Sequence, residues 1–112
     1  MQFTKDTSKV LASIYKLYLE KRKNDQPKED AMHFDSDFWH NVEALSSYSE
    51  SDISTSLHEL KNAEFVKCYI SGDFKIENAL IVQMENRFKD GAAGVAKYLL
   101  DLVTNAVSGL SF

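Results

Sequence analysis

The sequence is short of the residues that cross-link or interrupt a fold. Its 112 residues include one cysteine, Cys68, and one proline, so an internal disulfide framework is excluded. No apolar run reaches the ~20 residues of a membrane span, because Lys97 and Asp101 interrupt the most apolar stretch. The first residues, MQFTKDTSK, lack the apolar segment of a secretory signal. We therefore expect a small soluble, cytoplasmic protein with no membrane segment.

The motifs of common catalytic and cofactor sites are also missing. The chain has no nucleophile elbow, zinc-protease motif, phosphate-binding loop or dinucleotide-binding loop. His33, Asp35, Asp37 and His40 lie close in sequence, but their spacing matches no established metal-ligand pattern. Cys68 alternates with apolar neighbours, which predicts a buried small side chain rather than a redox-active thiol. We expect no enzyme activity, no metal and no cofactor.

Positive charge is scarce where a nucleic-acid-binding face would need it. The chain has 13 Lys and Arg against 17 Asp and Glu, for a net charge of −4. Residues 1–28 hold seven basic and three acidic side chains, residues 29–64 hold one and nine, and residues 65–112 hold five and five. The acidic block is therefore confined to the middle of the chain. Its charge opposes binding to nucleic acid and favours a basic partner.

The first half of the chain predicts two helices joined by a loop. Helical spacing over residues 6–23 gives one apolar stripe, with Thr7 or Ser8 as the N-cap. The stripe consists of Val10, Leu11, Ile14, Leu17 and Tyr18. Residues 24–36 read as a loop in which residues 31–34 form a short strand that pairs with a later hairpin. A short helix over residues 37–46, capped by Asp35 or Ser36, follows.

Residues 49–66 carry the strongest local signal in the sequence. Ser49 and Asp52 form a capping-box pattern, and an apolar stripe at helical spacing follows, so we expect a helix over residues 50–63. Alternating residues 66–70, a turn at residues 71–73 and an apolar return strand over residues 74–83 predict a β-hairpin. From residue 84 the chain reads as helical again, with a break near Asp90 and Gly91.

The last segment predicts a markedly apolar helix. Such a helix needs a partner, which is either the first helix of the same chain or a second copy. We expect a homodimer, with a dimerisation surface formed by Val95, Leu99, Leu102, Val103 and Val107.

The run VEALSSYSESDISTSLHELKNAEFVKCYI resembles the pattern of winged-helix regulators of the MarR and PadR kind. The matching positions are Ser49, Ile53, Ser54, Leu57, Leu60, Phe65 and Val66. The layout also resembles small bacterial and phage winged-helix proteins of the YjcQ-like group. This resemblance implies an α+β, mostly α fold: a winged helix-turn-helix of three helices and a β-hairpin wing over residues 1–90, with an added C-terminal helix over residues 91–112. Glu64 stands where the family has glycine, so a left-handed helix end is not expected there.

The resemblance also implies a non-catalytic transcriptional regulator that binds double-stranded DNA as a dimer. Its contacts would come from the third helix, from the wing and from the end of the first helix: Ser51, Thr55, His58, Lys61, Asn62, Lys75, Lys21, Arg22 and Lys23. The acidic block supports an alternative, an interaction module whose helix-turn-helix face docks a basic protein, as an anti-repressor or accessory factor does. A third reading is a dimer that binds an effector or a peptide in a pocket under its C-terminal helix.

Overall fold

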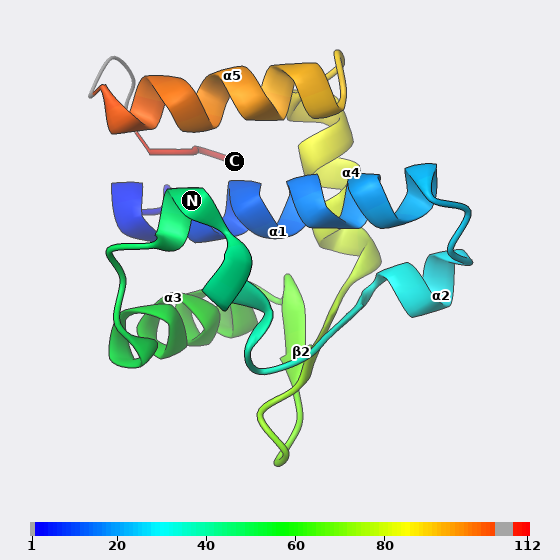
Figure 1. The fold of residues 1–112 in the computed structure, drawn as a ribbon, viewed down its shortest axis with the longest axis vertical. Helices are drawn as coiled ribbons and strands as arrows, with labels where there is room; N and C mark the ends of the chain where they lie inside the picture. Colours follow the sequence, from blue (N-terminus) through cyan, green and yellow to red (C-terminus); the bar gives the residue numbers. More distant parts are fainter. Residues whose placement is uncertain (1, 105–108) are drawn as a thin grey trace.

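The computed structural model describes residues 2–104 and 109–112 as a mostly helical α+β fold with a small three-stranded antiparallel sheet (Figure 1). Within these residues no helix has the length and apolar character needed to cross a membrane. The elements in chain order are α1 (Lys5–Lys23), α2 (Lys28–Ala31), β1 (His33–Phe34), the 3₁₀ turns η1 (Phe38–Asn41) and η2 (Glu43–Leu45), α3 (Glu50–Asn62), β2 (Val66–Cys68), β3 (Phe74–Ile76), α4 (Asn78–Arg87) and α5 (Ala92–Val103).

Helix α1 is the centre of the fold. All six residues from 10 to 15 are buried, so the middle of this helix has no solvent face. Helix α5 runs antiparallel along one side of α1, and α3 and the turn η2 pack on other sides (Figure 1). A helix enclosed in this way must carry small or apolar side chains on every face. Ala12 and Ser13 meet that requirement beside the predicted stripe, and the Ser13 hydroxyl donates to the Lys9 carbonyl oxygen at 2.7 Å.

The predicted bounds of the first helix are confirmed to within one residue, but its cap differs. Thr4 is the N-cap, and its hydroxyl oxygen accepts a hydrogen bond from the Thr7 backbone N–H at 3.3 Å. Thr7 and Ser8, the two predicted caps, are buried inside the helix instead. Because the helix begins earlier than predicted, both hydroxyl groups point toward the core. There they form hydrogen bonds with other polar groups.

The sheet has the strand order β1-β3-β2 and forms the base of the hairpin. The expected pairing of the early strand with the hairpin is confirmed, with His33 opposite Lys75 and Phe34 opposite Phe74. The rings of Phe34, Phe38 and Phe74 pack together with centroid distances of 5.1–5.9 Å. This aromatic cluster fixes the hairpin to the body of the molecule.

The predicted helix over residues 37–46 is wrong. The segment forms the two 3₁₀ turns η1 and η2, separated by Val42 in an extended conformation. Neither Asp35 nor Ser36 caps it, since Asp37 is the N-cap of η1 and makes no side-chain cap bond. The aromatic, Asn and β-branched residues here are weak helix formers. The interruption lets Phe38 join the aromatic cluster while Leu45 is buried beside α1.

The predicted return strand is also wrong beyond Ile76. Residues 78–87 form α4, with Leu80, Ile81 and Met84 buried and Val82 exposed. Burial at this spacing is helical, whereas a strand would bury every second residue. The expected break near residue 90 is confirmed, because Gly91 adopts a positive φ of 66° directly before α5.

Helix α3 begins and ends with well-defined caps. The predicted capping box is confirmed: the Asp52 N–H donates to Ser49 Oγ at 3.2 Å, and the Ser49 N–H donates to Asp52 Oδ2 at 3.0 Å. The expectation that Glu64 would not form a left-handed helix end is wrong, because its φ is 64°. The Glu64 N–H donates to the Lys61 carbonyl and the Phe65 N–H to the Leu60 carbonyl, which is a Schellman motif.

The two ends of the chain are joined. The Phe3 N–H donates to the Leu110 carbonyl at 2.9 Å, and the Leu110 N–H donates to Ser8 Oγ at 2.7 Å. The rings of Phe3, Phe65 and Phe112 pack together with centroid distances of 5.7–6.2 Å. The C-terminal segment is thus held against the start of α1.

The C-terminal helix packs on its own chain. Val95, Leu99 and Leu102 are buried in the same hydrophobic core as α1 and α3, so they do not face a second copy. Val103 is exposed, and Val107 lies outside the described residues. Residues on both sides of position 90 therefore share one core.

We predict opposite effects for two glycine-to-alanine substitutions. A Cβ on Gly109 would lie 2.2 Å from the Phe3 carbonyl oxygen, so Gly109→Ala should lower the free energy of unfolding by roughly 1–3 kcal/mol. Gly94→Ala, in α5, would meet nothing closer than Asp90 Cβ at 3.5 Å and should raise it by about 0.5–1 kcal/mol. Urea denaturation measures both. Equal stability of Gly109→Ala and the wild type would contradict the joined chain ends.

Candidate functional site

The outward face of α3 is an uncharged polar stripe. Ser51, Thr55, His58 and Asn62 recur at helical spacing and are all exposed, opposite the buried side of the helix. Lys61 is also exposed, on the flank of this stripe. The structure therefore brings together the five α3 residues that the sequence predicted as contacts.

Two carboxylates of α3 are engaged in internal contacts. The Ser49 backbone N–H donates to the Asp52 carboxylate and lowers its pKa. Glu59 accepts a hydrogen bond from the Thr7 hydroxyl, which also lies 3.2 Å from Ser56 Oγ. These contacts stabilise the start of α3 and its packing on α1, so both carboxylates have structural roles.

Most acidic side chains of the middle segment are exposed to solvent, including that of Asp52. We use the term acidic segment for residues 35–64. Its only Lys or Arg residue is Lys61. The exposed carboxylates of the segment are Asp35, Asp37, Glu43, Glu50, Asp52 and Glu64. The exposed charged side chains of the acidic segment are therefore six carboxylates and one ammonium group.

Lys21 is held against the body of the protein. Its Nζ lies 3.7 Å from the centroid of the Phe34 ring and donates to the His33 carbonyl oxygen at 2.7 Å. Burial lowers the pKa of Lys21, and the Asp35 carboxylate opposes that shift. The amine thus joins α1 to β1 and stabilises the base of the hairpin.

Lys75 of β3 is paired with a carboxylate of α2. Its Nζ lies 2.6 Å from Glu29 Oε2, between β3 and α2. The hydrogen bond and the charge of Lys75 lower the pKa of Glu29, and the hydrogen bond that Lys75 donates to Glu29 raises the pKa of Lys75. This predicted wing contact therefore already has a partner within the chain.

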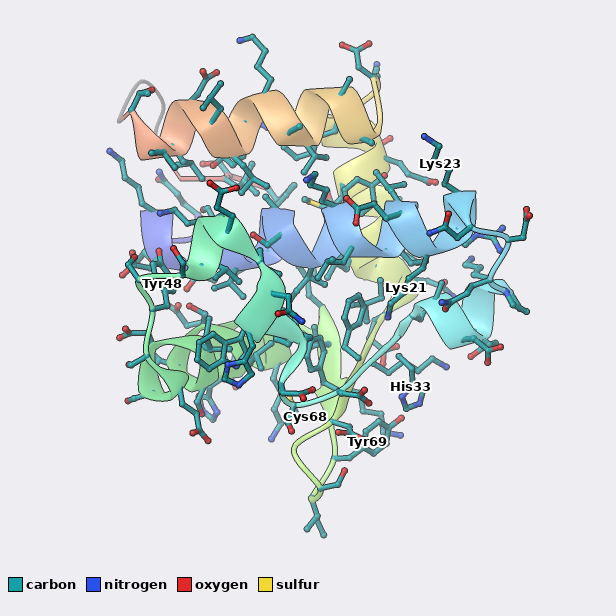
Figure 2. The ribbon with its side chains drawn as sticks, viewed as in Figure 1. Lys21, Lys23, His33, Tyr48, Cys68 and Tyr69 are labelled. Carbon is teal, nitrogen blue, oxygen red and sulfur yellow. The ribbon has the colours of Figure 1, made fainter. Side chains whose placement is uncertain are left out.

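Arg22 and Lys23 are exposed but lie away from α3. Lys23 sits at the end of α1 farthest from α3, as Figure 2 shows. The Arg22 Nη1 group donates to the Gln26 carbonyl oxygen at 3.0 Å. The basic cluster at the end of α1 and the polar stripe of α3 therefore do not form one continuous surface.

Tyr48 anchors the segment that precedes α3. Its hydroxyl donates to Asp6 Oδ1 at 2.8 Å, and Lys9 Nζ lies 5.2 Å from the centroid of its ring. Burial and the hydrogen bond to Asp6 raise the pKa of Tyr48. Tyr48 therefore connects α1 to the turn before α3.

Cys68 is exposed, so the prediction of a buried thiol is wrong. Its position in β2 places it on the face of the strand that points toward the core. However, β2 is the edge strand of the sheet and extends beyond the core at Cys68 (Figure 2). Beside it, the Tyr69 and His33 rings stack at 5.7 Å. Among residues 2–104 and 109–112, no three His, Cys, Asp or Glu side chains form a group that could hold a metal ion.

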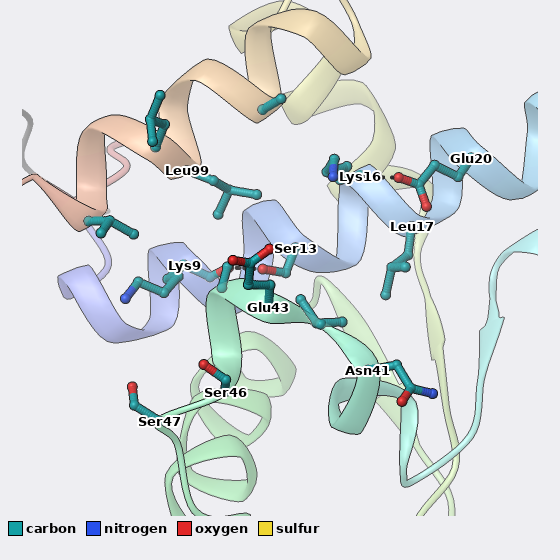
Figure 3. A pocket seen from close by; sticks show the side chains of 15 residues that line it. Lys9, Ser13, Lys16, Leu17, Glu20, Asn41, Glu43, Ser46, Ser47 and Leu99 are labelled. Atoms are coloured by element: carbon teal, nitrogen blue, oxygen red, sulfur yellow. Dashed lines mark hydrogen bonds and ion pairs between the residues drawn. The ribbon is translucent and has the colours of Figure 1, made fainter.

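A groove of about 740 Å³ lies between α1, the 3₁₀ turns and α5 (Figure 3). Its apolar wall includes Leu17, Val42 and Leu99. The charged side chains along its rim are Lys9, Lys16, Glu20 and Glu43. The sequence reading placed a pocket under the C-terminal helix, and this groove borders α5, but the lining residues of α1 and of the 3₁₀ turns were not predicted.

Comparison of the chain with protein-family models, with curated proteins and with solved structures finds no match. The outward stripe of α3 and six carboxylates of the acidic segment are exposed.

The Glu29–Lys75 pair should give a pH-dependent contribution to stability. The lowered pKa of Glu29 means that the contribution is present above about pH 4.3 and is lost as pH falls through the folded-state pKa. The raised pKa of Lys75 means that it is present below about pH 10.4 and is lost as pH rises through the folded-state pKa. A double-mutant cycle of Glu29→Gln and Lys75→Met, read by urea denaturation, should show stronger coupling at pH 7 than at pH 3. Equal coupling at both values would contradict the pairing.

Proposed function

We propose that the chain is a non-catalytic winged-helix module that acts by docking a basic protein partner. The fold part of this proposal is supported by element order: α1, β1, two turns, α3, and a hairpin whose return strand pairs with β1. In such a module α3 corresponds to the recognition helix, and the hairpin is the wing. The turns η1 and η2 take the place of the second helix.

The docking part rests on which charges remain free. Of the cations at the hairpin, Lys21 packs on Phe34 and Lys75 is paired with Glu29, which leaves Lys67 of β2 exposed. Five carboxylates of the acidic segment are exposed and lie outside the α3 cap, against the single ammonium group of Lys61. A duplex would meet repulsion at this surface, whereas Lys and Arg side chains of a protein would meet opposite charge.

DNA-dependent transcriptional regulation is the second candidate, because the outermost stripe of α3 is uncharged. Ser51, Thr55, His58 and Asn62 carry hydrogen-bonding groups that suit base edges, with Lys61 beside them. Asp52 is engaged in the helix cap and Glu59 with Thr7, which reduces the acidic side chains presented by this helix. This candidate is weakened because few free Lys and Arg side chains are placed to contact phosphates.

Charge reversal tests the docking proposal with a matched control. Asp37→Lys/Glu50→Lys changes two exposed carboxylates of the acidic segment, and Glu85→Lys/Asp90→Lys changes two exposed carboxylates outside it. Both variants have the same net charge. We expect the first to weaken binding of a labelled Lys/Arg-rich helical peptide at least 10-fold, while the second weakens it by less than 3-fold, as measured by fluorescence anisotropy.

Equal weakening by both variants would contradict a docking site in the acidic segment. The same titration against a random 20-base-pair duplex at low salt separates the two candidates. We expect no binding of duplex at ~100 µM protein, since nonspecific DNA binders reach Kd values of about 1–100 µM. Saturable duplex binding that Lys61→Glu abolishes would favour the DNA-dependent function instead.

A further inference from the structure

The groove between α1, the 3₁₀ turns and α5 carries apolar side chains on each of its walls. Leu99, Leu100 and Val103 line the α5 wall, Leu17 lines the α1 wall, and Val42 lines the wall of the turns (Figure 3). Leu100 is 64% exposed and Val103 is 59% exposed, both high values for large apolar side chains. The volume of about 740 Å³ lies within the range of binding pockets, so these side chains can be covered by one ligand.

The length of the groove matches a short helix. Its α5 wall runs from Ala96 to Val103, which is about 10 Å at a rise of about 1.5 Å per residue. Its α1 wall runs from Lys9 to Glu20, which is about 16 Å. The groove therefore accommodates about two to three helical turns. A segment of that length presents its apolar side chains to a groove at positions i, i+3, i+4 and i+7.

The two lysines that line the groove are engaged within the chain. Lys16 Nζ lies 3.6 Å from Glu20 Oε1, one turn along α1. Lys9 Nζ lies 5.2 Å from the centroid of the Tyr48 ring, beside the turn before α3. Both ammonium groups thus have an attractive contact inside the chain, and the charge of Glu20 is matched by that of Lys16.

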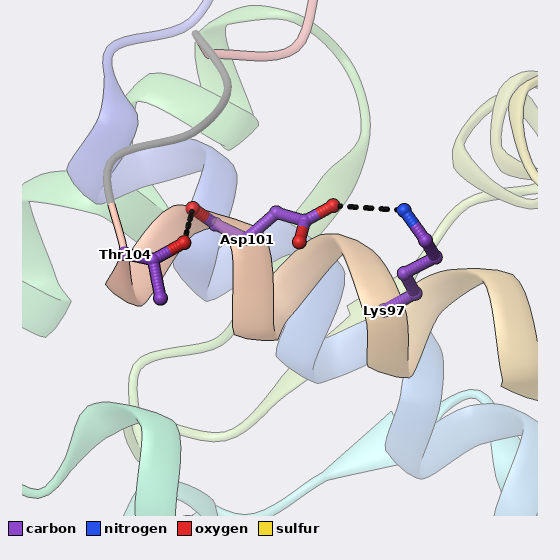
Figure 4. Close-up of polar contacts among 3 residues, drawn as sticks. All are labelled: Lys97, Asp101 and Thr104. Atoms are coloured by element: carbon purple, nitrogen blue, oxygen red, sulfur yellow. Dashed lines mark hydrogen bonds and ion pairs between the residues drawn. The ribbon is translucent and has the colours of Figure 1, made fainter.

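Glu43 is the charged lining residue that remains free. Within residues 2–104 and 109–112 its carboxylate pairs with no Lys, Arg or His side chain, and its side chain extends from η2 toward α5 in Figure 3. The charges of α5 are paired with each other outside the groove, since Lys97 Nζ lies 3.2 Å from Asp101 Oδ2 (Figure 4). A cationic group placed in the groove would therefore meet one unpaired carboxylate among apolar walls.

We propose that the groove binds an amphipathic helical segment of the basic partner. Apolar side chains of the segment pack against Leu17, Leu100 and Val103, and a Lys or Arg side chain beside them pairs with Glu43. Glu43 also belongs to the acidic segment, so the groove and the proposed docking surface share this carboxylate. The inference rests on the proposed docking function, which supplies the positive charge of the partner.

Two labelled helical peptides of about 14 residues test the proposal by fluorescence anisotropy. One carries leucines at i, i+4 and i+7 flanked by lysines, and the other has alanines in place of the leucines. Docking through charge alone predicts equal binding, whereas the groove predicts that the leucine peptide binds about 10-fold more tightly. Leu100→Asn should remove most of this advantage without changing the net charge. Val82→Asn is the matched control, because Val82 is 51% exposed on α4 outside the groove, and it should leave the advantage unchanged.

A second pair of variants tests the role of Glu43. Glu43→Gln should weaken the leucine peptide about 3-fold, as expected for an exposed ion pair, while Glu85→Gln, on α4, should not. Circular dichroism checks that each variant folds. The groove is overturned, and the docking proposal stands, if both peptides bind equally well or if Leu100→Asn binds the leucine peptide as the wild type does. Failure of both peptides to bind would overturn both proposals. Self-association of the chain that Leu100→Asn abolishes would assign the groove to a second copy instead.

Discussion

The enclosure of α1 is the constraint on which the rest of the structure depends. Residues 10–15 have no solvent face, because α5 covers one side of the helix while α3 and η2 cover others. Removing any one of these neighbours would expose apolar surface on α1 at about 25 cal/mol for each Å². The C-terminal helix is therefore part of the core, and α3 is fixed on the same support, with its polar stripe directed to solvent.

The local signals in the sequence predicted the parts of the fold that local interactions determine. The capping box of Ser49 and Asp52 and the apolar spacing after it indicated α3, and the cation-rich end of α1 indicated its C-terminus. The sequence-based predictions were wrong where the same residues are compatible with more than one secondary structure. Residues 79–82 are a short apolar run that fits a strand or a helix, and only packing on the core decides between them.

The candidate site was predictable in position but not in charge. Helical periodicity alone places Ser51, Thr55, His58 and Asn62 on one stripe of α3, and all four are exposed. Periodicity does not show that Lys21 packs on Phe34 or that Lys75 pairs with Glu29, because these contacts join residues distant in sequence. The tertiary structure therefore determines which charges remain free for a partner. These free charges support the proposal of a protein partner over that of DNA.

Native-state hydrogen exchange of the full-length chain tests the shared core most directly. If α1 supports both α3 and α5, the slowest amides of α1, such as that of Ile14, and of α5, such as that of Leu99, exchange through one global opening. Their exchange free energies then agree and decrease together as denaturant is added. Exchange of Leu99 at a clearly lower free energy, while Ile14 stays protected, would contradict the account and would make the C-terminal helix a separate unit.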